Sequence, residues 1–395
     1  MRQTVLKLIA GTILFFSLIP FTQAQTDRIN VVTTAVPFLR ISPDARAGGM
    51  GDLALATSPD ANSSFWNLGK VPFNEGNGGL SLSYTPWLKD ILNDVYLASI
   101  AGFYKLDDLQ AISGSLRYFS LGNIQFTDGL GQDLNTYRPR EFGLDAGYSR
   151  KLSDKSGLGV GLKYIYSNLA SGSYFGNTYK AASSVAGDLS YYYKGHNDQG
   201  QGWAFGAALT NLGSKISYTD NANDKDYIPA NMGLGTTYTR VFNQSNKMTF
   251  GLDLNKLLVP TPPQPIPPST SITQAQLDDY RSKSVVGSWF SSFGDAPDGF
   301  SEEMKEFQVS LGAEYMYNNQ FALRTGYFYE NKLKGNRRYF TMGVGIKYSS
   351  FGLDFSYLLP SGSGVDRNPL SNTLRFSLHF NFDGTGAGAG TTPGN

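Results

Sequence analysis

The 395-residue sequence contains no cysteine, which excludes a disulfide scaffold, a thiol nucleophile and a thiolate metal site. Histidine is scarce as well: His196 and His379 are the two in the chain, and they leave few ligands for a zinc site. An excess of charge is also lacking, because the net charge of +1 is spread along the chain and no basic face suggests nucleic acid. We therefore expect no metal, no cofactor and no nucleic-acid partner.

One long apolar run is present, and it lies at the N-terminus. Arg2 and Lys7 precede an apolar core from Leu8 to Ile19, and Thr22-Gln23-Ala24 fits a cleavage site. The core is shorter than the roughly 20 residues of a membrane-spanning helix. The pattern therefore predicts a signal peptide over residues 1–24, cleaved near Ala24. Because no later stretch approaches a transmembrane helix, a membrane location would require a closed β-barrel.

Glycine (45), phenylalanine (26) and tyrosine (24) are abundant, and they occur in segments where apolar and polar residues alternate. In residues 374–382, every second residue is apolar and the residues between them are polar. Long strands with aromatics on one face and glycine and charge on the other favour lipid outside and a polar lumen inside. We predict an all-β fold, a transmembrane antiparallel β-barrel of about 14 strands over residues 78–383. The segments are 79–86, 94–104, 110–121, 139–151, 156–168, 178–194, 201–211, 229–242, 246–257, 305–317, 320–329, 337–348, 351–359 and 371–383.

The connections between these segments alternate between short and long. Short polar turns occupy every second connection, whereas the connections between them are longer. Outer-membrane barrels have short periplasmic turns and long outer loops, so this alternation predicts a multi-pass barrel in the outer membrane of a Gram-negative cell. The turns are 107–108, 153–155, 196–198, 244–245, 318–319 and 349–350, and the larger loops include 122–138, 212–228, 258–304 and 360–370.

The outer loop 258–304 is the longest connection. It begins with a proline-rich stretch, which predicts extended chain. Thr273 then offers a helix N-cap, and the sequence SEEMKEF from Ser301 resembles the start of another capped helix. Long loops are commonly functional, and exposed aromatics on them favour partner binding. The residues predicted to bind a partner are Val285, Val286, Trp289, Phe290 and Phe293.

The alternation also predicts which charged side chains face the lumen. Fourteen strands enclose more space than their own side chains fill, so another segment must occupy the lumen. We predict that residues 25–77 form this hatch. The lumen-facing carboxylates are predicted to be Glu141, Asp145, Asp188, Asp253, Glu314 and Asp354, with Lys163, Arg324, Lys347 and Arg375 opposite them.

Small and charged residues mark the segment predicted as the hatch. Ala45, Ala47, Gly48, Gly49 and Gly51 permit close approach to the barrel wall. Arg40 and Arg46 are expected to pair with lumen carboxylates. Three aspartates are expected to cap short helices, one of them a turn over Leu53–Ala56. The predicted plug residues are Arg40, Asp44, Arg46, Gly48, Gly49, Met50, Gly51, Asp52, Asp60 and Asn67.

Patterns for chemistry are weak, and we expect no enzyme. His379 lies beside Ser377 on one strand face, but no third group completes a triad. The alternating glycines from Gly157 precede no helix, which argues against a phosphate loop. The run DNANDKD from Asp220 lacks the glycine and distal glutamate of a calcium loop.

The stretch PFLRISPDARAGGMGDLALATSPDANSSFWNLGK, from Pro37, resembles the N-terminal signature of the PorV (LptO) family of the type IX secretion system. That family belongs to the wider FadL-like group of fourteen-stranded barrels with a hatch in the lumen. One departure is that Asn67 is followed by Leu68-Gly69, where the group commonly has Asn-Pro-Ala. The sibling PorQ family is a competing match, which PFLRISPDARAGG disfavours.

The resemblance implies a non-enzymatic function in protein transport. Proteins of this family accompany the SprA (Sov) translocon. They receive cargo through the C-terminal signal domain of the cargo protein and deliver it to the PorU attachment machinery. Three alternatives remain: a FadL-like transporter of hydrophobic small molecules, a barrel enzyme and an open porin. An apolar pocket beside the hatch with a lateral opening in the wall would favour the first. The tail, residues 384–395, is expected to be flexible.

Overall fold

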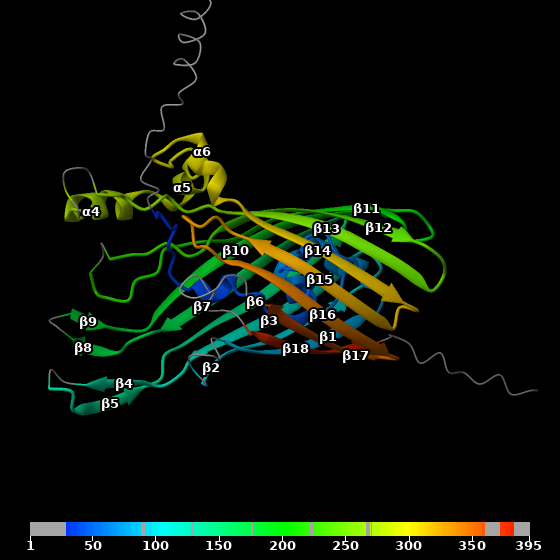
Figure 1. Ribbon diagram of the computed structural model, residues 1–395, viewed down its shortest axis with the longest axis horizontal. Helices are drawn as coiled ribbons and strands as arrows, with labels where there is room; N and C mark the ends of the chain where they lie inside the picture. Colours follow the sequence, from blue (N-terminus) through cyan, green and yellow to red (C-terminus); the bar gives the residue numbers. More distant parts are fainter. Residues whose placement is uncertain are drawn as a thin grey trace, which may run out of the picture.

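The computed structural model describes residues 29–87, 92, 94–127, 130–174, 177–221, 224–265, 269, 271–359 and 372–382. The predicted signal peptide, the loop 360–370 and the tail 384–395 lie outside these residues. Fourteen antiparallel strands close into a barrel, which confirms the predicted fold class (Figure 1). They are β1 (Gly78–Pro86), β2 (Val95–Lys105), β3 (Gln110–Leu121), β6 (Arg140–Lys151), β7 (Ser156–Asn168), β10 (Ala182–His196), β11 (Gly202–Gly213), β12 (Asn231–Val241), β13 (Asn246–Leu257), β14 (Gln308–Tyr317), β15 (Phe321–Tyr329), β16 (Arg338–Tyr348), β17 (Phe351–Leu359) and β18 (Leu374–Phe382).

The two ends of the barrel differ in their connections. Short hairpins such as 106–109 and 349–350 join strands at one end, here called the turn end. The other, here called the loop end, carries two hairpins that the sequence count did not include (Figure 1). These are β4 (Ile124–Thr127) with β5 (Asp133–Tyr137), and β8 (Gly172–Tyr174) with β9 (Asn177–Tyr179).

The helices of the long β13–β14 connection also lie at the loop end (Figure 1). They are α4 (Gln274–Ser282), α5 (Val285–Ser291), α6 (Phe300–Glu303) and η3 (Met304–Glu306). The Thr273 side chain caps α4 in a complete capping box, as the sequence predicts. Ser301 does not cap α6, because the N-cap is Gly299 and no side chain makes the cap bond. Within the described ranges, no helix has the length and apolar character to cross a membrane.

Side chains alternate around the barrel wall as the sequence predicts. Along β17 and β18, Leu353 and Phe376 are half-exposed on the outer face. Asp354 and Arg375 on the inner face are 7% and 2% exposed. An apolar outer face with a polar inner face suits a barrel surrounded by lipid.

The residues before β1, from 29 to 77, are here called the N-terminal segment. They contain η1 (Pro37–Arg40), α2 (Ala45–Gly48), α3 (Ser63–Trp66) and η2 (Leu68–Phe73). Their contacts reach strands all around the barrel: the Pro43 carbonyl accepts a hydrogen bond from Ser99 on β2, and the Ala54 nitrogen donates to Asp253 on β13, on the opposite side. A segment that touches strands on opposite sides of a closed barrel must lie in its lumen, as Figure 1 shows.

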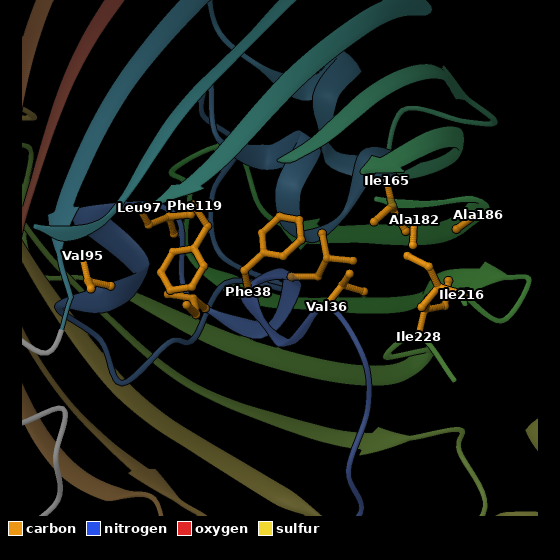
Figure 2. Packing of buried hydrophobic residues seen from close by; sticks show 12 residues of the cluster. Val36, Phe38, Val95, Leu97, Phe119, Ile165, Ala182, Ala186, Ile216 and Ile228 are labelled. Carbon is orange, nitrogen blue, oxygen red and sulfur yellow. The ribbon is translucent and has the colours of Figure 1, made fainter. Parts of the chain in front are cut away.

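The segment begins at the loop end and leaves at the turn end. Its Asn30 nitrogen donates to the Leu333 carbonyl and its Ala35 nitrogen to the Tyr227 carbonyl, both in loop-end connections. In the outer half of the lumen, Phe38 stacks on Phe119 with ring centroids 6.4 Å apart. Figure 2 shows Phe38 in this apolar cluster, which joins the segment to the wall.

Glycines on the wall let the segment approach the strands closely. A Cβ at Gly326 would lie 2.0 Å from the Met50 carbonyl carbon and 2.2 Å from the Gly51 nitrogen. Gly51 itself has a φ of +71°, a conformation that favours glycine. Backbone thus packs on backbone here, with no space for a side chain.

Replacing Gly326 with alanine is expected to destabilise the folded barrel by about 1–3 kcal/mol, because the added methyl overlaps immovable backbone. The measurement is the temperature at which the purified protein loses its fast-migrating folded band in gel electrophoresis. Gly352→Ala is the matched control, since its Cβ would meet its nearest atoms at 3.6 Å. Equal transition temperatures for the two variants would contradict the close packing described for Gly326.

Candidate functional site: the filled lumen and the loop end

Arg46 is the centre of a buried charge network in the lumen. Its Nε and Nη2 donate to the two carboxylate oxygens of Glu314 on β14, at 3.1 and 2.9 Å. Its Nη1 donates to Asp60 at 2.8 Å and to the Ser58 carbonyl at 3.0 Å. A bidentate contact of this kind fixes orientation as well as charge. Arg46 therefore joins two parts of the N-terminal segment to the barrel wall.

The network continues across the wall from Glu314. Arg324 Nε donates to Glu314 at 2.7 Å, and its Nη1 donates to Asp354 at 2.6 Å. His379 Nε2 lies 2.7 Å from the second Asp354 oxygen. Positive and negative groups alternate along this chain, so each buried charge has an opposite neighbour.

The sequence did not indicate the contact between His379 and Asp354. The pair lies toward the turn end, because His379 is paired with Gly352 beside the short turn 349–350. The neighbouring Ser377 hydroxyl contacts Ser83 at 2.6 Å and accepts a hydrogen bond from the Ala45 nitrogen at 2.8 Å. His196, the first residue of the predicted turn 196–198, is instead the last residue of β10. Among the described residues, no cluster of three histidines or carboxylates is arranged to hold a metal.

Two further carboxylates, one on the wall and one on the segment, join the two without the segment's arginines. One Asp253 oxygen accepts hydrogen bonds from the Ala54 and Leu55 nitrogens, at 2.7 and 2.9 Å. Asp52 of the segment accepts from the Tyr339 hydroxyl at 2.6 Å and lies 3.6 Å from Arg375. Charge-assisted bonds to backbone nitrogens position the chain as firmly as side-chain pairs do.

Glu141 and Asp145 face inward but do not bind the N-terminal segment's arginines. Glu141 accepts a hydrogen bond from the Ser167 hydroxyl at 2.6 Å. Lys163 bridges Asp145 and Asp188, at 3.1 Å to each. These groups therefore stabilise the wall, near the register shift between Gly187 and Leu189 where β10 pairs with β11.

The expected helix caps are only partly present. Asp44 caps α2, accepting from the Ala47 nitrogen at 2.8 Å, and also accepts from the Trp66 indole at 2.8 Å. Asp52 and Asp60 cap no helix, and the predicted helical turn at Leu53–Ala56 is wrong. The Asp253 carboxylate binds the backbone nitrogens there, which gives the chain an alternative to helical hydrogen bonds.

The small residues of the predicted plug lie against the wall. A Cβ at Gly48 would be 2.6 Å from Arg375 Nη1, and one at Gly49 would be 3.1 Å from the Gly343 Cα. Met50 is buried and packs over Gly312 and Gly326. This stretch therefore lies on β14 to β18, where side chains of ordinary size would not fit.

Asn67 stabilises its turn without the proline common in the FadL-like group. Its Nδ2 donates to the Leu55 and Tyr191 carbonyls, both at 2.9 Å. Its Oδ1 accepts from the Gly69 nitrogen at 2.9 Å. Nearby Lys70 is 1% exposed and donates to the Ala54 carbonyl at 2.7 Å, an internal tie that the sequence did not indicate.

Arg40 pairs at the loop end and not with a predicted lumen carboxylate. Its Nη2 lies 3.3 Å from Glu330, which also accepts from Arg337 Nε at 2.8 Å. Burial raises the pKa of Glu330, but the hydrogen bonds and charges of Arg337 and Arg40 outweigh it and hold the pKa below its usual range. Glu330 directly follows β15 and was missed because the alternation ends there.

A second buried cluster lies beneath the helices of the β13–β14 connection. Lys256 is fully buried and lies 2.7 Å from Glu303 and 2.6 Å from Glu306. Lys334 lies 2.6 Å from Glu302 and 2.9 Å from Glu306. This loop-end cluster was also missed, because SEEMKEF was interpreted only as a helix start.

The N-terminal segment joins the loop-end cluster. Asn30 donates to Glu302 at 3.2 Å and accepts from Gln264 at 2.7 Å. Val32 packs in the same apolar group as Tyr227 and Val259. The segment in the lumen and the outer loops therefore form one connected structure.

The predicted partner residues divide into buried and exposed ones. Val285 packs inward against the apolar group around Val259, and Trp289 is half-buried. Phe290, by contrast, is 76% exposed. With exposed neighbours on the same connection it forms what is here called the loop patch. The loop patch consists of Val286, Phe290, Phe293, Phe300 and Met304.

A family model described as "Type IX secretion system protein PorV" matches residues 23–264, more than half of the chain. The chain belongs to the PorV family. Membership implies association with the type IX secretion machinery and, with the closed barrel, an outer-membrane location. It also indicates a non-enzymatic component of secretion or transport.

Solved structures of FadL-like barrels share the fold. The toluene transporter TbuX of Ralstonia pickettii is 12% identical, with a TM-score of 0.52 over 86% of this chain and 98% of that one. The toluene transporter TodX of P. putida is 14% identical, with a TM-score of 0.50 over 87% and 99%. A comparison with curated proteins found no match. At these identities the likeness shows the barrel fold alone.

Charge reversal at Arg46 tests the network. In Arg46→Glu, a third carboxylate would face Glu314 and Asp60, and breaking a buried pair costs about 3–5 kcal/mol. We expect the segment to loosen and cells to become more sensitive to vancomycin, a large antibiotic that an intact outer membrane excludes. The control is Arg138→Glu, an exposed loop-end arginine that donates to Asn123. An unchanged permeability barrier in a normally assembled Arg46→Glu barrel would contradict the prediction.

Proposed function

We propose that this chain is a plugged outer-membrane component of the type IX secretion system. It associates with the SprA (Sov) translocon, captures cargo through the C-terminal signal domain, and shuttles it to the PorU attachment machinery. The observation that carries the proposal is the PorV-family match over residues 23–264. The matched region includes the N-terminal segment that fills the lumen.

The filled lumen favours a shuttle over a pore. Contacts hold the segment to the wall at different points around the barrel. They include the bond of Arg46 to Glu314, the bond of Asp253 to Ala54, and the packing of Met50 on Gly326. A folded cargo domain has no path through a lumen held in this way, so cargo would bind outside it. Residues 29–77 therefore act as a hatch that seals the barrel.

The loop patch is the surface that we assign to partner binding. Its aromatic side chains are exposed, whereas the loop beneath is fixed by the buried pairs of Lys256 and Lys334. Rigid aromatic anchors lose little conformational entropy on binding, which makes such a surface suitable for a protein partner. A flexible solvated loop would not need four buried ion pairs under it.

A transporter of hydrophobic small molecules is the second candidate, because the fold resembles that of TbuX and TodX. A groove of about 420 Å³ exists at the loop end, between the proline-rich stretch and α4, and its lining mixes Pro263, Ala275 and Tyr280 with Gln264, Gln276, Asp279 and Lys283. The small cavity beside the hatch is lined by charged groups that include Asp44, Arg46, Asp60 and Lys70. Charged walls disfavour an apolar ligand there and support the secretion proposal.

Replacing Phe290 and Phe300 with serine is expected to weaken binding of the translocon. Each aromatic anchor at an interface contributes about 2 kcal/mol, so losing both lowers affinity by more than about tenfold. The measurement is the amount of SprA that co-purifies with the tagged protein, together with secretion of cargo that carries the C-terminal signal domain.

The matched control replaces Ile124 and Leu130 with serine, because these exposed apolar residues lie on the β4–β5 hairpin at the same end. It should retain both SprA and cargo secretion. If the Phe290/Phe300 variant also retains them, the loop patch is not the partner surface. If it loses SprA and cargo secretion and gains toluene uptake, the plugged-shuttle proposal is wrong.

A further inference from the structure

Five lysines encircle the mouth of the lumen at the turn end. They lie at the ends of five different strands, and each shares its strand face with buried lumen residues, for example Lys151 with Ser149 and Lys194 with Tyr192. Alternation therefore directs all of them toward the lumen. They are Lys105 on β2, Lys151 on β6, Lys194 on β10, Lys247 on β13 and Lys347 on β16, here called the mouth ring.

Contacts with the end of the N-terminal segment agree with this direction. Lys151 Nζ lies 5.2 Å from the Phe73 ring centroid, Lys105 donates to the Asn74 carbonyl, and Lys347 lies 3.9 Å from Glu75. These lysines come from separated strands, yet all reach residues 73–75. The mouth ring thus surrounds the place where the segment leaves the lumen.

The positive charge of the mouth ring is poorly balanced. Among the residues that the structure describes, no carboxylate lies within 4.0 Å of the ammonium groups of Lys151, Lys194 or Lys247, and the Glu75 side chain is 96% exposed. The turn aspartates nearby include Asp107, whose carboxylate accepts hydrogen bonds from Leu109 and Gln110 of its own turn. Lys105 and Lys151 repel each other, as do Lys247 and Lys347, while Asp108, Glu75 and Glu314 attract these lysines without forming a close ion pair with Lys105 or Lys247.

A ring of like charges around a mouth with low-dielectric walls concentrates its field on an oppositely charged ligand. Because the lysines face the lumen and not the lipid, they are poorly placed for phosphates of the inner leaflet. Their wide spacing suits several carboxylates carried on one chain better than a single small anion. An outer-membrane barrel presents its turn end to the periplasm.

We propose that the mouth ring is a docking site for an acidic segment of a periplasmic protein. Carboxylates of that segment approach the ammonium groups of Lys151, Lys194 and Lys247, which have no carboxylate within 4.0 Å in the part of the chain that the structure describes. The site lies at the opposite end from the loop patch, so both surfaces can be occupied at once. It contacts residues 73–75, the last part of the hatch before β1.

The experiment uses the full-length chain in nanodiscs of zwitterionic lipid, with a fluorescent peptide of glutamates as the acidic probe. Anisotropy measures its affinity. The ring variant carries Lys151→Gln, Lys194→Gln and Lys247→Gln, which leaves the lysines that contact Asn74 and Glu75 in place. We expect this variant to lose about tenfold in affinity, and wild-type binding to weaken as salt rises.

The matched control carries Arg150→Gln, Lys155→Gln and Arg240→Gln, which remove the same charge from the outer wall and a turn at the same end. It should bind the probe as wild type does. Equal loss in both variants would mean a nonspecific charge effect, and equal binding by the ring variant and wild type would exclude the site. If the mouth ring instead retains vesicles of anionic lipid and not the peptide, the proposed occupant is wrong.

Folding of the ring variant is checked by its fast-migrating band in gel electrophoresis. If that band is lost, the pair Lys194→Gln with Lys247→Gln replaces it, with Arg150→Gln and Lys155→Gln as its control. A wild-type chain that shows no salt-sensitive binding of the peptide would overturn the proposal without any variant.

Discussion

The ion pair between Arg46 and Glu314 is the contact on which the closed lumen depends. A barrel of fourteen strands is too wide for its own side chains to fill, so its interior must hold either water or another segment. A segment without positive charge would leave the carboxylates on the wall uncompensated. Arg46 compensates Glu314 and Asp60 together, while Arg324 carries the compensation on to Asp354. Within this network each buried charge thereby lies against an opposite one.

Charge alone does not hold the segment. The ion pairs reach their short distances only where the backbone of the segment lies close to the backbone of the wall. Gly326 and Gly312 admit Met50, and Gly206 and Gly235 admit Leu55. The abundance of glycine in the strands is thus partly a property of the packed lumen. Arg46 determines where the segment lies, and the glycines let it lie there. Neither feature is sufficient by itself.

Features of the barrel that depend on local periodicity were predictable from the sequence. Two-residue alternation placed Glu314 and Asp354 on the inner face and implied the strand count, because each strand encodes its own pattern. It did not predict that Arg40 binds Glu330 or that Asp253 binds backbone at Ala54, since such partners depend on the path of the segment through the lumen. Val285 was predicted to bind a partner, but it packs inward. The sequence did not reveal this, because the apolar group beneath Val285 comes from distant parts of the chain. Composition therefore identified the binding loop but did not distinguish its anchors from its exposed surface.

The N-terminal segment is not held equally along its length. At the turn end it continues covalently into β1, and in the middle it is held by buried charge pairs, whose separation would leave a buried charge uncompensated at a cost of about 3–5 kcal/mol. At the loop end it is held by the hydrogen bonds of Asn30 and Ala35, each worth about 1 kcal/mol, and by the packing of Val32. Local opening starts where the stabilisation is least, so residues 29–35 separate before the apolar cluster of Val36 and Phe38 and the Arg46 network do. In the proposed function, partner binding at the loop patch therefore acts first on the outer end of the hatch, while the lumen below stays closed.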